Sequence, residues 1–332
     1  MIMARYLILL FSLSCLLSPP GRAATPLDNV IRLGLAESYA TAVLLTGGNA
    51  VRFGFWDFNP NDVVGLEDED LGSLEAQQIR QRIRTFSLPY TWSTPLGEKD
   101  NTLVLGVKAA YLGQVQETQI VSSNTLAKDS IDSSVTTLTA GGELRHRATD
   151  HLGLAVGMNL NLQRYRNSTD FNTPESQALA PLLDGLITNY SANAWQAEPH
   201  VRATWFVGGR DTEVKLISDF HYMRGRTFDT DRAAHEVQPE AWHWSNGVRW
   251  RHPYVTRFLP GQNVWMQASR YDLGGDLGDA LGNHYYYEAG VGWLLDVRKI
   301  NIPFVDNVGI GINLNYGSVL RGGTLVLLFN EA

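Results

Sequence analysis

The chain has 332 residues and a formal net charge of −7, because 34 Asp and Glu outnumber 27 Lys and Arg. An acidic chain lacks the basic surface on which nucleic-acid binding depends, so we expect no nucleic-acid partner. Hydrophobic residues make up 44% of the chain, which also contains 31 Gly, 9 Trp and 13 Tyr. This mixture is typical of strands that are apolar on one face only.

The N-terminus carries the features of a secretory signal peptide. Arg5 supplies a positive start, Leu7 to Leu17 form an apolar run, and small residues near Ala23 suit signal peptidase. The apolar run is shorter than the roughly 20 residues that a membrane-spanning helix needs. We therefore expect residues 1–23 to be cleaved during export through the Sec pathway. Cys15, the only cysteine, leaves with them, so no disulfide and no cysteine-based metal site are expected in the mature protein.

Residues 24–48 are predicted to form a helical segment in front of the strands. Apolar residues recur at helical spacing between Leu27 and Leu45, and Gly47 with Gly48 provides a stop. Three positions are open to this helix. It can lie across the periplasmic mouth of a barrel, enter the lumen, or remain unattached in the periplasm.

The rest of the chain, residues 49–332, alternates as β-strands do. In one segment Leu154, Val156 and Met158 share a face, while small and amide residues occupy the other. Several of these runs are 11 to 14 residues long, whereas soluble strands average about five or six and membrane strands need about 9 to 11. Twelve such segments are predicted: 49–58, 79–92, 101–112, 134–146, 151–164, 191–206, 212–224, 240–251, 262–271, 284–296, 307–317 and 321–330.

Aromatic residues lie at the ends of the apolar stripes, as at Trp195 and Trp205. Such girdles mark the two interfaces of a transmembrane barrel. The opposite stripe carries ionisable residues that the core of a soluble sandwich cannot bury unpaired. Because every backbone group must be hydrogen-bonded internally within lipid, the sheet has to close. We predict an all-β fold, a transmembrane antiparallel up-and-down barrel of twelve strands.

The connectors between the segments alternate in length, and this alternation indicates the orientation. Short turns are periplasmic and long loops are extracellular in such barrels. An intermediate connector spans 272–283. The short connectors lie near 93–100, 147–150, 207–211, 252–261 and 297–306, and the long ones near 59–78, 113–133, 165–190 and 225–239.

The last strand matches the outer-membrane assembly signal in part. Arg321, Gly323, Val326 and Leu328 follow its pattern, but three residues come after Phe329 in place of a terminal aromatic. The expected partners are therefore the barrel assembly machinery during biogenesis, and outer-membrane lipid and lipopolysaccharide afterwards. The expected location is the outer membrane of a Gram-negative bacterium.

A short N-terminal helix that leads into twelve strands resembles the β-domain of autotransporters. Because the mature chain begins almost at the helix, we expect no secreted passenger domain, and residues 27–332 resemble the solitary autotransporter-type barrels. The resemblance rests on architecture, and it implies an outer-membrane location and a lumen-plugging helix but no particular reaction. Our leading hypothesis is a non-enzymatic barrel with a structural role or limited solute passage. A passive porin is an alternative that needs the helix outside the lumen.

The face opposite the apolar stripes carries charges of both signs. In a confined lumen such residues can form ion pairs across the barrel or select solutes in a narrow pore. A barrel of this size has room for a helix or a water channel, but not comfortably for both. The residues predicted to line the lumen are Lys108, Glu143, Arg145, Glu198, His200, Arg202, Lys215, Asp219, His221, Arg249, Arg251 and Glu288.

One short motif suggests an enzyme. His243-Trp244-Ser245-Asn246-Gly247 resembles a motif of outer-membrane phospholipase A and is similar to a string in lipid A deacylases. His243 and Ser245 share a face, so the imidazole could activate the hydroxyl as a nucleophile in a lipid acyl hydrolase. The family's third member falls here on Arg257, which cannot orient a histidine. The apolar neighbours also turn Ser245 into the lumen, away from lipid, so we expect lumen lining rather than catalysis.

Three arginines form a second candidate site. Arg80, Arg82 and Arg84 share an outward face near the extracellular rim. Guanidinium groups there can bind lipopolysaccharide phosphates in forked pairs, although an ordinary solvated rim explains them equally well. We expect no metal site and no cofactor.

Overall fold

A computed structural model describes residues 26–48, 50–58, 80–97, 100–118, 120, 127–207, 213–254, 261–280, 284–297, 307–317 and 320–329. The predicted signal peptide lies outside these ranges. None of the helices in the described ranges is both long and apolar enough to cross a membrane.

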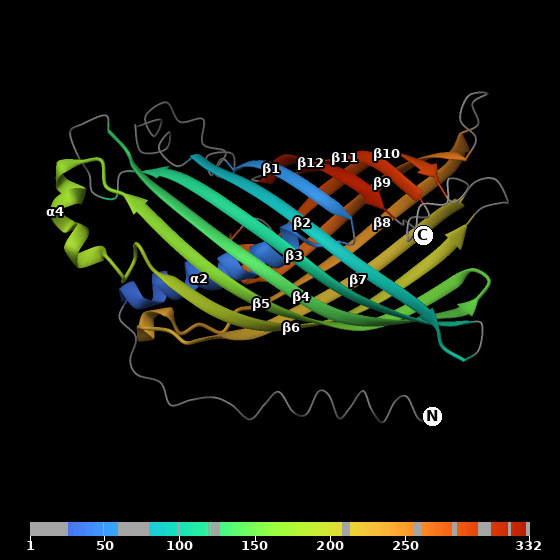
Figure 1. The fold of residues 1–332 in the computed structure, drawn as a ribbon, viewed down its shortest axis with the longest axis horizontal. Helices are drawn as coiled ribbons and strands as arrows, with labels where there is room; N and C mark the ends of the chain where they lie inside the picture. The colour runs from blue at the N-terminus through green and yellow to red at the C-terminus, as the bar shows by residue number, and fades with distance from the viewer. Residues whose placement is uncertain are drawn as a thin grey trace.

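The described chain forms a closed antiparallel barrel of twelve strands, which confirms the predicted fold class (Figure 1). Each strand pairs with its neighbours in sequence, and the first strand closes the barrel against the last through pairs such as Val51↔Leu327. Closure removes both sheet edges, as a spanning sheet requires. The strands are β1 Val51–Phe58, β2 Arg80–Pro95, β3 Asn101–Thr118, β4 Asp129–Thr149, β5 Leu152–Asp170, β6 Ser191–Val207, β7 Glu213–Phe228, β8 Glu240–Tyr254, β9 Gln262–Gly275, β10 Tyr285–Asp296, β11 Asn307–Tyr316 and β12 Leu320–Phe329.

The alternation along β5 shows why these residues form a barrel wall. Leu160 and Leu162 point outward and are exposed on the protein surface, whereas Asn161 and Gln163 point inward and are buried. An apolar outer stripe and a polar inner stripe suit lipid on one side and a polar lumen on the other.

Several strands extend farther toward the long-loop end than the sequence predicts. The pairing of β3 with β4 continues to Thr118↔Asp129, and that of β4 with β5 continues to Ser130↔Asp170. The predicted loops 113–133 and 165–190 were therefore too long. The backbone ladder continues beyond the apolar stripe between polar residues, where the hydrophobic pattern gives no signal.

The N-terminal helix, α2 Pro26–Leu45, lies inside the lumen with its start at the end of the barrel that carries α4 (Figure 1). Its residues Leu35, Tyr39 and Val43 recur every four positions and are almost completely buried. They pack against inward-facing apolar residues such as Val135 and Met223. Of the three positions that the sequence left open, the structure has the helix inside the barrel.

In the described ranges, three short helices lie at the long-loop end. They are α4 Pro174–Leu183, η3 Ala233–His235 and α5 Asp276–Ala280. Both η3 and α5 contact α2, and Arg32 of α2 donates to the carbonyl oxygen of Ala233 in η3 at 2.8 Å. These contacts fix the outer part of α2.

Candidate functional site: the plugged lumen

The lumen contains a polar cavity of about 740 Å³ between the end of α2 and the short-turn end of the barrel. Leu45, Gly47 and Gly48, at the end of α2, line the side of the cavity that faces the helix. Every charged residue predicted to face the lumen also lines this cavity: Lys108, Glu143, Arg145, Glu198, His200, Arg202, Lys215, Asp219, His221, Arg249, Arg251 and Glu288.

Polar contacts anchor α2 to the barrel wall above this cavity. The Tyr39 hydroxyl donates to the carbonyl oxygen of Ala192 at 2.8 Å, and the Gln163 amide donates to the carbonyl oxygen of Tyr39 at 3.0 Å. The Lys108 ammonium donates to the carbonyl oxygen of Thr46 at 3.1 Å. The carbonyl groups at a helix C-terminus carry partial negative charge, so a lysine stabilises the plug where it meets the cavity.

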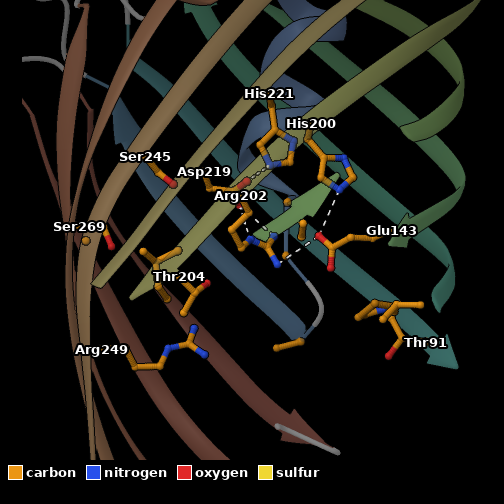
Figure 2. A pocket seen from close by; sticks show the side chains of 18 of the residues that line it. Thr91, Glu143, His200, Arg202, Thr204, Asp219, His221, Ser245, Arg249 and Ser269 are labelled. Carbon is orange, nitrogen blue, oxygen red and sulfur yellow. Dashed lines mark hydrogen bonds and ion pairs between the residues drawn. The ribbon is translucent and has the colours of Figure 1, made fainter. Parts of the chain in front are cut away.

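Arg202 lies at the centre of an ion-pair network on the cavity wall (Figure 2). Its guanidinium contacts Asp219 at 2.8 Å and Glu143 at 3.3 Å. Glu143 also accepts a hydrogen bond from Arg145. These carboxylates are largely buried, and charges in such surroundings persist only when they are paired. The network therefore links β4, β6 and β7 across the inner face of β5.

Three histidines from neighbouring strands stack beside this network. The rings of His200 and His221 lie 4.8 Å apart and those of His221 and His243 lie 4.4 Å apart, each pair inclined by 14°. The strand register places the three residues directly opposite one another. His221 lies between two carboxylates, with Glu198 at 2.7 Å and Asp219 at 3.2 Å.

A glycine makes room for this histidine stack. A Cβ on Gly157 would overlap the His200 imidazole and approach the Gly142 carbonyl oxygen. His200 then reaches Glu143 at 3.3 Å. This stack was not predicted, because it depends on the register between strands, and a single sequence does not reveal that register.

The structure does not assemble a catalytic pair at His243 and Ser245. Both residues line the cavity, but no hydrogen bond joins them among the described residues. The His243 ring is stacked on His221 instead, and its Nδ1 atom has no hydrogen-bond partner in the described part of the chain. Ser245 lies opposite Asp219 in the strand pairing. Arg257 lies outside the described residues.

The three rim arginines are only partly described. Arg84 points outward from β2 and is exposed. The side chains of Arg80 and Arg82 lie outside the described part of the structure. A shared phosphate site on this face therefore remains a prediction.

Two cavity-lining cations escaped the sequence analysis. Arg52 of β1 and Arg147 of β4 both line the cavity, and the guanidinium of Arg147 lies 4.4 Å from the centre of the Phe206 ring. Arg147 follows Arg145 by two positions on the same strand, so the alternation that identified Arg145 also indicated Arg147.

Comparison with known proteins supplies the family context. A family model described as "solitary outer membrane autotransporter beta-barrel domain" matches residues 36–331. No curated protein matches the sequence.

Solved autotransporter barrels have a similar fold. The β-domain of the Bordetella autotransporter BrkA is 10% identical with a TM-score of 0.53, and the match covers 86% of this chain and 98% of that one. The transport unit of AIDA-I from Escherichia coli is 11% identical with a TM-score of 0.52, covering 90% and 99%. The translocator domain of NalP from Neisseria meningitidis is 10% identical with a TM-score of 0.50, covering 90% and 94%. At such low identity the likeness concerns the fold alone.

Proposed function

Because the chain belongs to the family of solitary outer-membrane autotransporter β-barrel domains, we propose that it is a non-enzymatic barrel closed by its own N-terminal helix. Membership implies a bacterial outer membrane as its location. In this proposal α2 is a resident plug rather than a tether to a secreted passenger domain. Solute passage is limited to moments when the plug loosens.

The burial of α2 in the long-loop half of the lumen is the observation that carries this proposal. Tyr39 has no exposed surface, and its ring lies 6.4 Å from that of Tyr165 on the wall. The helix also contacts η3 and α5 at the mouth. A barrel of this size that holds a helix has little room for a water channel beside it.

The polar cavity below the plug fits limited passage better than permanent closure of the whole lumen. The ion pairs in this cavity brace the wall from β4 to β7. The short-turn half of the barrel therefore needs no helix to fill it. An opening therefore requires movement only in the upper half, where α2 is held by apolar packing and by hydrogen bonds that include those of Tyr39, Lys108 and Arg32.

A lipid acyl hydrolase at Ser245 has weaker support. Ser245 faces a lumenal cavity near Asp219 and Tyr271, whereas acyl chains of membrane lipid lie outside the barrel. Its candidate base, His243, is engaged in ring stacking with His221. A general base has to reach the proton that it removes, and His243 does not make that contact here.

Single-channel conductance tests the proposal. The full mature chain and a variant without residues 26–46 are refolded, checked for the heat-dependent shift in gel mobility that folded barrels show, and inserted into planar bilayers. We expect little steady current from the full chain and a large, stable current from the deletion variant. Equal currents from the two folded proteins would show that α2 does not close the lumen.

A second measurement tests the alternative that the protein is a lipid acyl hydrolase. Refolded protein and the Ser245→Ala variant are incubated with phospholipid and lipopolysaccharide, and released fatty acid is quantified. We expect no release from either protein. Release by the unsubstituted chain that disappears in the variant would contradict the non-enzymatic proposal.

Contact with lipopolysaccharide is a further part of the proposal. Arg84 is exposed on the outward face of β2, where a guanidinium group can meet a lipid phosphate. We expect Arg84→Gln to weaken binding of lipopolysaccharide to the refolded barrel, measured by co-sedimentation. The other proposed partner, the barrel assembly machinery, is needed only while the barrel is inserted into the membrane.

A further inference from the structure

The cavity below the plug is richer in positive charge than the protein that contains it. Among the described residues, eight Lys and Arg but only six Asp and Glu line the cavity, although the whole chain has a net charge of −7. Six of these cations come from β4, β6, β7 and β8: Arg145, Arg147, Arg202, Lys215, Arg249 and Arg251. We call this part of the cavity, with these six residues, the cationic vestibule.

The vestibule contains a like-charge pair. Lys215 and Arg249 lie directly opposite each other on β7 and β8, and both line the cavity. Like charges in opposite register destabilise a strand pair unless an anion lies nearby. Glu213 contacts Lys215 at 2.9 Å, but Glu213 also lies opposite Arg251 in the strand pairing. On β7 and β8 three cations and one carboxylate therefore lie together, and Gln267 links Arg249 to Glu288 of β10.

Two cations of the vestibule are paired with deeper carboxylates, Arg145 with Glu143 and Arg202 with both Glu143 and Asp219. Glu143 and Asp219 both contact Arg202 and each also meets a histidine. Arg249 donates to the neutral amide oxygen of Gln267 at 3.2 Å, and its guanidinium points into the cavity (Figure 2). The cationic excess therefore lies toward the short-turn mouth.

The wall between the two groups of cations is lined with small residues. The inward positions Gly153 and Ala155 of β5 lie opposite Arg147 and Arg145 of β4, respectively, and both line the cavity. Ala155 also lies opposite Arg202 of β6. Glu143 lies between Arg145 and Arg202 here, and the Phe206 ring lies beside Gly153, so the space for a ligand is the remaining open volume of the cavity.

We propose that the cationic vestibule binds a small multivalent oxyanion, a solute that carries several phosphate or carboxylate groups. Guanidinium forks match the paired oxygens of both groups. The cavity volume of about 740 Å³ falls within the range of small-molecule sites. Low-dielectric walls lined by one sign of charge concentrate ions of the other sign.

The alternatives fit the charge pattern less well. A metal cation needs a cluster of oxygen or nitrogen ligands, and the described residues contain no group of three or more His, Cys, Asp and Glu residues that could hold one. A neutral sugar gains nothing from a cationic excess. Arg147 and Glu213 at the short-turn end line the cavity, and short turns are periplasmic in such barrels, so in this proposal the ligand enters from the periplasmic side.

Isothermal titration calorimetry of the refolded full chain tests this site. Sodium tripolyphosphate and sodium citrate are titrated separately at constant ionic strength, with glucose as the neutral comparison. We expect saturable binding of at least one oxyanion, and the tighter of the two identifies phosphate or carboxylate as the preferred group. No saturable binding of either oxyanion, or equal binding of glucose, would overturn the proposal.

Substitutions then locate the binding. Arg249→Gln and Arg251→Gln each remove one charge-assisted contact, so we expect each to raise the Kd about tenfold, which corresponds to about 1.4 kcal/mol. Arg164→Gln removes an exposed, outward-facing arginine of β5 and is the matched control, with an expected Kd equal to that of the unsubstituted chain. Equal Kd values for the vestibule variants and the control would place the anion elsewhere.

Folding of each variant is checked by the heat-dependent gel shift. Arg249→Lys keeps the charge but loses the fork, so we expect a Kd between those of the unsubstituted chain and Arg249→Gln. If Arg249→Gln does not fold, the salt dependence of oxyanion binding to the unsubstituted chain tests the proposal. Binding that does not weaken as the salt concentration is raised would contradict a charged site. The conductance of the variant without α2 does not depend on whether the oxyanion binds. Failure of the binding proposal can therefore be distinguished from failure of the proposed function.

Discussion

The two halves of the lumen are built from the same strands but are filled in different ways. Toward the long loops, inward-facing Val135, Ala194 and Met223 are fully buried against α2. Toward the short turns, the same strands present Arg145, Arg202 and Lys215 to an open cavity. The same wall is therefore apolar in one half, where the helix covers it, and polar in the other half, where ion pairs join its charged side chains.

This difference indicates where movement is possible. Apolar packing against α2 is lost as soon as the helix leaves, whereas the ion pairs of the lower half join one strand to another and do not involve the helix. Lys108 lies at the boundary, since it lines the cavity and also donates to the end of α2. Tyr39→Ala, Arg202→Met and Gly157→Ala are each compared below with a substitution in the same half that should have a smaller effect.

The largest effect is expected from Tyr39→Ala in the packed half. The ring is completely buried and its hydroxyl binds the Ala192 carbonyl oxygen, so truncation leaves a cavity and an unsatisfied acceptor. Loss of a buried aromatic side chain costs about 3–5 kcal/mol. We expect the helix to loosen, with more frequent channel openings in planar bilayers and faster amide hydrogen exchange in α2.

Leu33→Ala is the control for that experiment. Leu33 is on the same helix, but about half of its surface is exposed, so little packing is lost. Equal opening frequencies in the two variants would mean that α2 is not held by its buried face, and the contrast between the two halves would then be wrong.

Arg202→Met tests the ion-pair half. The substitution removes the cation that lies between Glu143 and Asp219 and leaves both carboxylates largely buried. Uncompensated buried charge is costly, but Arg202 retains some contact with water, so we expect a loss of about 2–3 kcal/mol in the free energy of unfolding. Urea-induced unfolding in lipid vesicles, followed by tryptophan fluorescence, measures the loss.

Lys215→Met provides the comparison. The Lys215–Glu213 pair lies near the mouth and Glu213 is well exposed, so its loss should cost less than about 1 kcal/mol. If this substitution destabilises the barrel as much as Arg202→Met, the deeper network has no special role in bracing the wall.

The sequence predicted most of this wall because side chains alternate with a period of two. Once Leu160 is placed outward, Asn161 must face inward. The same alternation predicted the charged residues that line the lumen. The helix itself was also predicted, since Leu35 and Tyr39 recur at helical spacing. Its position was not predicted, because the burial of Tyr39 depends on Tyr165 and Ala192, which lie far away in sequence.

The candidate site was predicted less completely than the wall. The stack of His200, His221 and His243 depends on the register of β6, β7 and β8, and alternation within one strand does not define the register of its neighbour. The suggested partnership of His243 with Ser245 failed for a related reason. His243 and Ser245 share a face but lie two positions apart on β8. His221 lies directly opposite His243 on β7, so the two imidazole rings stack on each other instead.

Gly157→Ala tests the packing around the histidine stack. The added methyl group would overlap the His200 ring and press on the Gly142 carbonyl oxygen. Overpacking of this kind costs about 1–3 kcal/mol, and we expect a value near the lower end because the imidazole can tilt. Unfolding in urea measures the loss. In Gly106→Ala, on the inner face of β3, the new methyl group makes ordinary contacts and should cost little. Equal costs would mean that His200 is not confined.

The smallest expected effect is a gain of stability at the outer end of the plug. Gly34 lies in α2 with no atom near its missing side chain, and glycine destabilises a helix by about 0.5–1 kcal/mol relative to alanine. Gly34→Ala should therefore make α2 more rigid without adding a contact to the wall, and channel openings should become rarer. This outcome separates two ways in which the plug can open. If α2 leaves the lumen as an intact helix, a stiffer helix changes nothing, and the opening frequency stays the same. If α2 first unwinds from its exposed end, where Leu33 and Gly34 lie, channel openings become rarer in Gly34→Ala. That result would mean that the packed half of the lumen opens by local unfolding of the helix and not by displacement of the intact helix.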